Sequence, residues 1–519
     1  MKRILSLICA IGLLLSAAAG LSSCKPKETD TGDADTISLS VLMSGMPVEK
    51  SYKYRDQVME AINKKLFADL GFKVNVKTTT YVDQFDTMLA LDLASGVNYD
   101  MIRTMPNTAA SYMEKNVFRD LKPLLPTYAP DILNTVPASV FAEDTLNGMI
   151  YGIPTCSFPI EYGMWFRGDW LQKLGKTVPT SLSELEALME ALKTNKELNS
   201  KNKVVPMAGH NGFLEQVFLG FFTDHPGDYL ENDKVLPKHF DPGYRKYTEK
   251  VAEWYKKGYV DDLILNGDEN VINDLLAKDR IGVHVGNVYQ LEYSTMKSYN
   301  EQKNMDMRWS IPFAADTKTY YSTGCGSDII AFPATSKVTE KALQFYNWYY
   351  NNNENADLVF FGIEGVTYNK STDPVTGKPY IVIPEAEVTE KIKTPAHLIG
   401  PIGSNVYTTQ QLMYTFADRP AESARAYDAC NTKEVLDNFH MDVTRYFQQT
   451  QTGTLGTKFE DARNMLIKRT TEMMVGKRPS TDAEWAAMKT EWERLGGKDS
   501  YDFSTQEYLK AKSTLTFLK

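Results

Sequence analysis

The chain has 519 residues, of which 43% are hydrophobic and 11% aromatic, and its formal net charge is −9. A chain this long exceeds what one hydrophobic core usually supports, so we expect at least two globular lobes. The acidic balance, with no basic block, argues against a nucleic-acid partner.

The N-terminus has the pattern of an export signal followed by a lipid attachment site. Lys2 and Arg3 precede an uncharged run over residues 4–20, which is shorter and more interrupted than a membrane-spanning helix. The run ends in Leu21-Ser22-Ser23-Cys24, which resembles the bacterial lipobox, where the cysteine is acylated and becomes the new N-terminus. The alternative is an ordinary cleaved signal with a cysteine beside it by chance.

This pattern predicts where the protein resides. We expect residues 1–23 to be a lipoprotein signal peptide and residues 24–36 to be a lipidated polar tether, since that segment has no large apolar residue. Cys24 would then be the only contact with the lipid bilayer. The rest of the chain would face the extracytoplasmic side of the cell membrane, at the cell surface or in the periplasm.

Alternating strand and helix patterns follow the tether. We predict strands over 37–43, 72–76 and 99–103, with helices over 51–70 and 83–94 between them. This order implies a parallel sheet with right-handed crossovers, in which ligands bind at the carboxyl ends of the strands. Those ends lie near residues 44–46, 80–84 and 104–107.

Several ordered motifs then resemble one family. They are Tyr151-Gly152-Ile153-Pro154, the runs 163–171 and 178–185, the helix pattern over 241–260 with its Trp-Tyr-x-x-Gly end, the strands at 278–287 and 324–333 with the helix after the latter, and the Gly-x-Glu-Gly turn within 361–368. Together they resemble the family 1 extracellular solute-binding proteins, the sugar-binding receptors of ABC importers, and in particular the large lipoprotein branch of that family.

The resemblance implies the fold. It implies an α/β, two-lobed periplasmic-binding-protein-like fold of type II, each lobe a mostly parallel sheet flanked by helices, with a helical C-terminal extension. Lobe 1 would comprise 37–155 with 310–335 returning to it, and lobe 2 would comprise 156–309 with 336–400 returning to it. Residues 401–519 would pack on both lobes. Crossings between the lobes are expected near 154–162 and 308–314, with a third at 333–338 as a further option.

A sugar receptor needs flat aromatic faces for the pyranose ring and polar side chains for the hydroxyl groups, in a cleft with mostly apolar walls. Strand ends and the family resemblance together select the candidate ligand-binding residues. They are Tyr81, Gln84, Asn107, Phe158, Glu161, Tyr162, Trp165, His210, Asn211, Asn287, Tyr320, Tyr321, Asp328 and Glu364. For each polar residue alone, a cap or turn role is the competing interpretation, and Trp165 could equally be a core residue.

Neither a metal nor a cofactor is expected. Cys156, Cys325 and Cys430 are too few and too scattered for a disulfide framework or a zinc site, and the histidines have no metal-ligand spacing. We interpret the three cysteines as small buried residues.

Three functions remain open from the sequence. The resemblance implies a monomeric, non-enzymatic receptor that captures an oligosaccharide or related sugar and delivers it to ABC permease subunits. An exported glycosidase-like enzyme is the first alternative, because paired carboxylates have no short motif by which they could be excluded. A surface lipoprotein without a transport role is the second.

Overall fold

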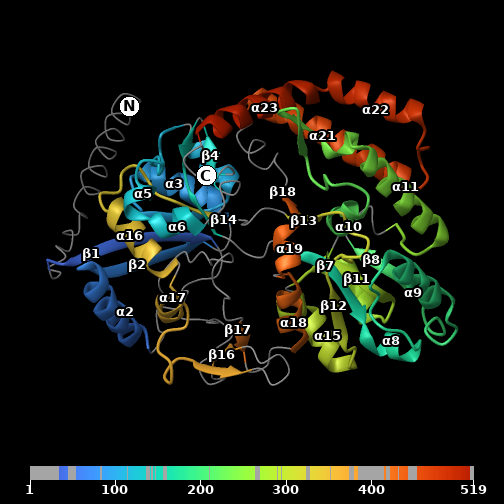
Figure 1. The fold of residues 1–519 in the computed structure, drawn as a ribbon, viewed down its shortest axis with the longest axis horizontal. Helices are drawn as coiled ribbons and strands as arrows, with labels where there is room; N and C mark the ends of the chain where they lie inside the picture. Colours follow the sequence, from blue (N-terminus) through green and yellow to red (C-terminus); the bar gives the residue numbers. More distant parts are fainter. Residues whose placement is uncertain are drawn as a thin grey trace, which may run out of the picture.

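The computed structural model describes residues 34–44, 54–81, 84–113, 115–135, 141, 144–146, 148–155, 160–209, 211–262, 269–288, 290–293, 295–322, 328–350, 352–372, 379–383, 414–416, 421–430, 432–441 and 453–514. These residues form two lobes, which lie side by side in Figure 1, with a set of C-terminal helices above them. Cys24, Phe158 and His210 lie outside the described residues, and so do Cys156 and Cys325.

A five-stranded sheet forms the centre of the first lobe, in the order β2-β1-β3-β14-β6. Its strands are β1 (Thr36–Ser44), β2 (Lys73–Tyr81), β3 (Met101–Thr104), β6 (Ile153–Thr155) and β14 (Asp328–Ala331). β1 runs parallel to β2 and β3, whereas β14 runs antiparallel to β3 and β6. The predicted parallel strand-helix-strand unit over residues 37–103 is therefore confirmed.

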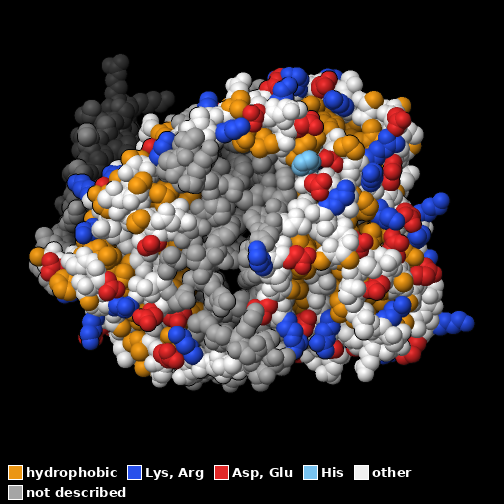
Figure 2. Space-filling model, viewed as in Figure 1, with side chains coloured by type: hydrophobic (Ala, Val, Ile, Leu, Met, Phe, Trp, Pro, Cys, Tyr) orange, Lys and Arg blue, Asp and Glu red, His pale blue; other side chains and the backbone are white. Residues whose placement is uncertain are grey.

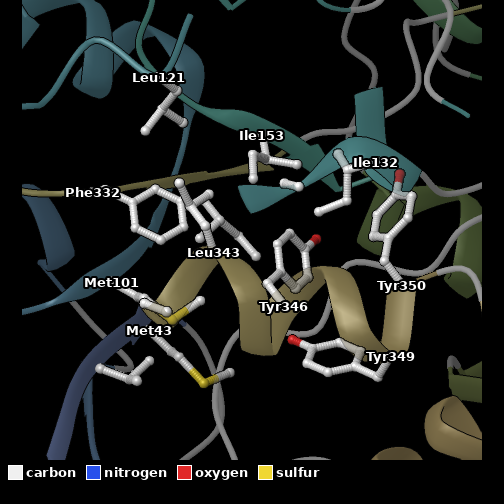
Figure 3. Close-up of a cluster of buried hydrophobic side chains, with 14 of the residues drawn as sticks. Met43, Met101, Leu121, Ile132, Ile153, Phe332, Leu343, Tyr346, Tyr349 and Tyr350 are labelled. Carbon is white, nitrogen blue, oxygen red and sulfur yellow. The ribbon is translucent and has the colours of Figure 1, made fainter. Parts of the chain in front are cut away.

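Helices cover both faces of this sheet. They are α2 (Arg55–Leu70), α3 (Phe85–Ser95), α4 (Pro106–Met113), α5 (Leu125–Tyr128), α6 (Pro130–Thr135), α16 (Thr339–Tyr350) and α17 (Asn353–Phe360). Alternate side chains of β1 face opposite ways: Val41 and Met43 pack in one core with α2 and α16, and Leu42 packs in another with α3 and α4. Figure 3 shows the first of these cores, with Tyr346 of α16 among aliphatic side chains.

A four-stranded sheet forms the centre of the second lobe, in the order β12-β7-β11-β8. Its strands are β7 (Tyr162–Arg167), β8 (Val205–Gly209), β11 (Ile281–Asn287) and β12 (Met307–Ser310). β7 is antiparallel to both of its neighbours, and only β8 and β11 run parallel. The two-lobed α/β fold is as expected, but the sheets are mixed, and "mostly parallel" is wrong for the second one.

Helices also cover both faces of the second sheet. They are α8 (Gly168–Lys173), α9 (Leu182–Thr194), α10 (Asn211–Phe218), the short 3-10 helices η1 (Leu219–Phe221) and η2 (Lys238–Phe240), α11 (Pro242–Lys257), α13 (Glu269–Ala277), α14 (Gln290–Tyr293) and α15 (Thr295–Lys303). Phe166 packs with α9, α10 and α11, while its neighbour Trp165 packs on the other face with α13 and α14.

Short strands complete both lobes. They are the hairpins β4 (Thr145–Leu146) with β5 (Met149–Ile150) and β9 (Tyr229–Glu231) with β10 (Lys234–Leu236), the pair β13 (Tyr320–Ser322) with β18 (Phe439–Met441), and the sheet of β15 (Asn369–Thr372), β16 (Pro379–Ile383) and β17 (Tyr414–Phe416).

The C-terminal helices touch both lobes. They are α18 (Ala421–Cys430), α19 (Lys433–Asp437), α21 (Gly453–Met474), α22 (Asp482–Arg494) and α23 (Gly497–Thr514). Phe459 and Leu466 of α21 belong to the same core as α2 and α16, whereas Met474 at its end belongs to the core of α10 and α11. α18 packs on β12, where Cys430 is a free buried thiol, as the sequence predicted for that cysteine.

One expected lobe assignment differs from the observed packing. Residues 336–400 were expected to return to lobe 2, but within that range α16 packs against α5 and α6, and α17 packs against α2, all in the first lobe. The optional crossing at 333–338 is also absent, because Pro333 bridges to Phe118 and the amide of Ala334 donates to the carbonyl of Val117. The apolar pattern of a helix shows that it is buried, but not against which lobe.

Candidate functional site

The strand ends of the first sheet define one edge of the candidate site. The parallel strands β1, β2 and β3 all end there, at Ser44, Tyr81 and Thr104. β14 starts and β6 ends at the same edge, because Ile329 pairs with Thr104 and Asp328 pairs with Thr155. The chain leaves the first lobe after Thr155 and re-enters it at Asp328, so these two connections to the second lobe start from this edge.

The second sheet presents a matching edge. Tyr162 starts β7 opposite Asn287 at the end of β11, and Gly209 ends β8 opposite Val285. β12 ends beside them, since Ser310 pairs with Met164. The chain therefore enters the second lobe at Tyr162 and leaves it after Ser310, both at this edge. The two edges are joined by the same two connections, and Figure 1 shows them turned toward the region between the lobes. This is where a ligand of an open α/β fold is expected.

Tyr81 stands at the end of β2 and is held by hydrogen bonds. Its hydroxyl group donates to Oδ2 of Asp92 at 2.6 Å, and the hydroxyl group of Tyr99 donates to the same oxygen at 2.6 Å. The hydrogen bond to Asp92, followed by burial, raises the pKa of Tyr81, so the phenol remains a neutral donor. Tyr81 is half-buried, and its ring has a fixed position at the first edge.

Three other predicted residues lie at the same edge as Tyr81. Gln84 is exposed and has a left-handed backbone (φ 53°) at the start of α3. Asn107 lies in the first turn of α4, directly after β3, and Asp328 starts β14; only the backbone of these two residues is described. The first edge thus gathers four of the predicted positions.

An aromatic pair forms the second edge. The rings of Tyr162 and Phe213 lie 4.8 Å apart between centroids with an interplanar angle of 32°, and both residues are half-buried. Asn287 and Glu161 flank Tyr162, the first through the β7–β11 pairing and the second along the chain. Asn211 begins α10 two residues before Phe213. Four predicted residues therefore meet here.

Phe213 was missed by the sequence reasoning. The signal is in the sequence, because His210 and Asn211 are candidate residues and Phe213 lies two residues after Asn211. It was not selected because an aromatic residue near the start of an apolar helix resembles any core position.

Trp165 is a core residue, and its selection as a ligand-binding residue is wrong in this structure. Its side chain is 0% exposed, and its ring lies 4.8 Å from that of Trp309. The indole Nε1 donates to the carbonyl oxygen of Asn287 at 3.0 Å. In β7 the side chains of Tyr162 and Trp165 are three residues apart and point to different faces, so only the strand end reaches the edge.

Tyr320 and Tyr321 lie on the connection between the lobes, in β13. Tyr320 is 1% exposed, and its hydroxyl group donates to Oε1 of Glu434 at 3.1 Å. Tyr321 is also largely buried, with Nζ of Lys238 5.8 Å from the centre of its ring. β13 pairs in parallel with β18, so these tyrosines anchor the connecting strand rather than offering an open face.

Glu364 lies in the turn that carries the Gly-x-Glu-Gly motif. It is exposed in the turn after α17, in the first lobe, with Nζ of Lys370 4.0 Å from its carboxylate. The backbone explains the Gly-x-Glu-Gly motif: Gly362 has φ 88° and Gly365 has φ 79°, values that side-chain-bearing residues rarely adopt. The motif therefore has a structural role in this chain.

Among the described residues, no group of three or more His, Cys, Asp or Glu side chains is placed to hold a metal ion. In that same part of the chain no helix is long and apolar enough to cross a membrane. What the described side chains of the two edges provide is aromatic surface, amides and a carboxylate, which suit recognition of a hydroxyl-rich ligand.

Sequence comparison identifies related proteins. Residues 57–376 match the family described as "Bacterial extracellular solute-binding protein". The polygalacturonan/rhamnogalacturonan-binding protein YtcQ of Bacillus subtilis (strain 168) is 20% identical over 389 residues, which are 73% of this chain and 74% of that protein. Lipoprotein LipO of the same organism is 26% identical over 355 residues, 64% of this chain and 67% of that protein.

Solved structures share the fold. An HMO-binding, ABC-transporter-associated solute-binding protein from Bifidobacterium longum infantis has a TM-score of 0.62 at 17% identity, covering 92% of this chain and 99% of that chain. The N-glycan transport solute-binding protein NgtS from Streptococcus pneumoniae has a TM-score of 0.59 at 18% identity, covering 93% and 100%. FusA from S. pneumoniae, in complex with kestose, has a TM-score of 0.58 at 17% identity, covering 92% and 100%. These proteins are named as binding proteins rather than enzymes.

Proposed function

Because this chain belongs to the bacterial extracellular solute-binding proteins, we propose that it is the receptor of an ABC importer and captures an oligosaccharide between its two lobes. Closure about the connecting segments would trap the ligand, and the closed form would pass it to permease subunits in the membrane. The observation that carries this proposal is the pair of facing strand-end edges, with Tyr81 on one and Tyr162, Phe213, Asn211 and Asn287 on the other.

The chemistry of these side chains suits a sugar. The C–H face of a pyranose or furanose ring packs on an aromatic ring, while amide groups donate to and accept from its hydroxyl groups. Tyr162 and Phe213 supply the aromatic surface; Asn287 pairs with Tyr162 across the strands, and Asn211 precedes Phe213 by two residues. The names of the relatives agree, since they include binders of polygalacturonan, N-glycan and kestose.

The surface is consistent with a small ligand rather than a nucleic acid. In Figure 2, acidic and basic side chains are interspersed over the described part of the visible face, most clearly on the second lobe. A nucleic-acid interface would gather basic side chains in one patch or stripe. The proposed partners are therefore a sugar and the permease, with the receptor acting as a monomer.

Lipid anchoring belongs to the same proposal. Acylation of Cys24 would hold the receptor at the extracytoplasmic side of the membrane, and the polar segment up to residue 36 would let it reach the permease. The relative named Lipoprotein LipO supports this arrangement. Labelling of the expressed protein with a fatty-acid analogue tests it: Cys24→Ser should abolish incorporation and release the protein from the membrane.

A binding titration tests the receptor function. Tryptophan fluorescence of the purified protein would be followed during addition of kestose, Man1GlcNAc or trigalacturonic acid, and the mixtures would be analysed for cleaved products. We expect a saturable change with at least one of these sugars and no product. Cleavage would favour the exported enzyme, and the absence of any response would count against an oligosaccharide receptor.

A matched pair of variants locates the site. Phe213→Ala should weaken binding by about fivefold to tenfold, the effect of losing about 1 kcal/mol of aromatic contact. Phe67→Ala is the control, because Phe67 is 41% exposed in the last turn of α2, at the opposite end of the first sheet. Equal affinities for the two variants would remove the Tyr162–Phe213 pair from the site.

A further inference from the structure

Asn211 is held from a distant part of the chain. Its Nδ2 donates to Oγ1 of Thr471 at 3.2 Å, although 260 residues separate the two in sequence. Thr471 lies in the last turn of α21, beyond the end of the family match at residue 376. A residue of the C-terminal helices therefore contacts a residue at the ligand-facing edge of the second lobe.

The hydrogen bonds of Thr471 fix which way the amide of Asn211 faces. The Thr471 hydroxyl group donates its proton to the carbonyl oxygen of Ile467 at 2.7 Å, so Oγ1 presents lone pairs to Asn211. Only the NH₂ group of the amide can meet a lone pair, because Oδ1 in its place would be repelled. Nδ2 is thus turned toward α21, and Oδ1 is turned away from it.

The other atom of this amide has no partner. Oδ1 of Asn211 is buried and accepts no hydrogen bond within the described part of the chain. A buried acceptor without a donor is destabilising, so such an atom is expected to be met by a donor in the functional state. A sugar hydroxyl group arriving at the edge beside Phe213 would supply that donor.

The end of α21 is firmly attached to α10. Met474 and Val475 share one core with Leu214 and Val217 of α10. Tyr244 of α11 donates to Oε2 of Glu215 at 2.7 Å, which ties α10 to the helix against which α21 packs. Figure 1 shows α21 beside α11. Thr471 is therefore held in place relative to Asn211.

We propose that Thr471 is a positioning residue of the ligand site: its hydroxyl group orients the amide of Asn211 so that Oδ1 accepts a hydrogen bond from a sugar hydroxyl group. This rests on the proposed function. It makes the last turn of α21 a part of the sugar site, in addition to its contacts with both lobes.

Thr471→Val tests the role, because it keeps the shape of the side chain and removes the acceptor. The matched control is Thr490→Val on α22, whose hydroxyl group also donates to a carbonyl oxygen four residues earlier, that of Ala486, at 3.1 Å. Thr471→Ser keeps the hydroxyl group and should therefore retain the sugar affinity of the wild type. Affinity would be measured for whichever of kestose, Man1GlcNAc and trigalacturonic acid the wild type binds, together with the melting temperature of each variant.

We expect Thr471→Val to bind the sugar about fivefold to tenfold more weakly, because it loses the effect of one neutral hydrogen bond. Thr471→Ser and Thr490→Val should bind within about twofold of the wild type. The melting temperatures of the two valine variants should agree. Unchanged affinity in Thr471→Val, or a loss that the serine does not rescue, would overturn the inference while leaving the receptor function intact. Failure of the wild type to bind any of the three sugars would instead refute the proposed function.

Discussion

His239 is a buried imidazole that the fold should keep neutral, which makes the stability of the second lobe depend on pH. It lies in η2 with its ring 4.5 Å from that of Tyr244, and within the described residues neither ring nitrogen has a hydrogen-bond partner. Burial lowers the pKa of His239 from 6.5 to about 3, against the opposing effect of the Glu215 carboxylate. The positive charges of Lys238 and Arg463 lower it further.

The size of the pH effect follows from the difference between the pKa of His239 in the unfolded chain and in the folded protein. The unfolded chain takes up a proton below pH 6.5, whereas the folded protein does so only near pH 3. The contribution of His239 to the free energy of unfolding is therefore fully present above pH 6.5. It decreases by about 1.4 kcal/mol per pH unit as the pH falls from 6.5 toward 3. At pH 5 the loss attributable to His239 is about 2 kcal/mol.

The variant His239→Leu removes this titration and keeps an apolar side chain in the same place. Urea unfolding at pH 8 and at pH 5 would give the free energy of unfolding of the wild type and the variant at each pH. The drop between the two pH values should be about 2 kcal/mol smaller in the variant. Titrating groups that His239 does not influence are common to both proteins and cancel in this comparison; Glu215, whose pKa His239 helps to lower, is the exception.

An equal drop in the two proteins would refute the reasoning. It would mean that His239 takes up a proton over the same pH range in the folded and unfolded states, with the Glu215 carboxylate fully offsetting the effect of burial. The ion pair of Glu215 with Lys238 would then have to be described as a three-membered network.

Two further predictions concern buried side chains. Asp144 is buried with no hydrogen-bond partner for Oδ2 within the described residues, and burial raises its pKa well above the usual value. The contribution of Asp144 to the free energy of unfolding is present at low pH and is lost as the pH rises through its folded-state pKa. Asp144→Asn should therefore be more stable than the wild type at pH 8 and lose that advantage at pH 4. Urea unfolding measures both, and a constant difference in the free energy of unfolding across this range would contradict the raised pKa of Asp144. Trp165→Ala should lower the free energy of unfolding by about 3–5 kcal/mol, as expected for a buried aromatic residue; a weakened affinity with unchanged stability would return Trp165 to the ligand site.

The first lobe was predictable because its signals are local. The sequences of strands β1 and β2 alternate, α2 ends at Gly71 with φ 73°, and α3 ends at Gly96 with φ 81°. These features depend on neighbouring residues only. Once the strands were parallel, their carboxyl ends had to share one edge, which is why Tyr81 and the residues after Thr104 were placed correctly.

The predictions were wrong or incomplete where a residue's position depends on contacts with a distant part of the chain. β7 reads as a nearly continuous apolar run because both of its faces are buried, so nothing in the run distinguishes the covered Trp165 from the edge residue Tyr162. The periodicity of hydrophobic residues in a strand does not show whether it pairs in parallel or antiparallel. The mixed pairing of the second sheet was therefore not predicted. The contact of Thr471 with Asn211 spans 260 residues and could not be inferred from either segment.

The C-terminal helices also constrain how the lobes can move. α21 has 22 residues, and a helix of that length is a rigid rod of roughly 33 Å. Phe459 and Leu466 are packed in the core of the first lobe, and Met474 is packed in the core of the second. The proposed closure would have to keep both sets of contacts or break one of them. A rotation that preserves the packing of α21 moves the strand-end edges most where they are farthest from this helix. Asn211, which is tied to α21 through Thr471, would then stay nearly fixed, and the first edge with Tyr81 would close onto it.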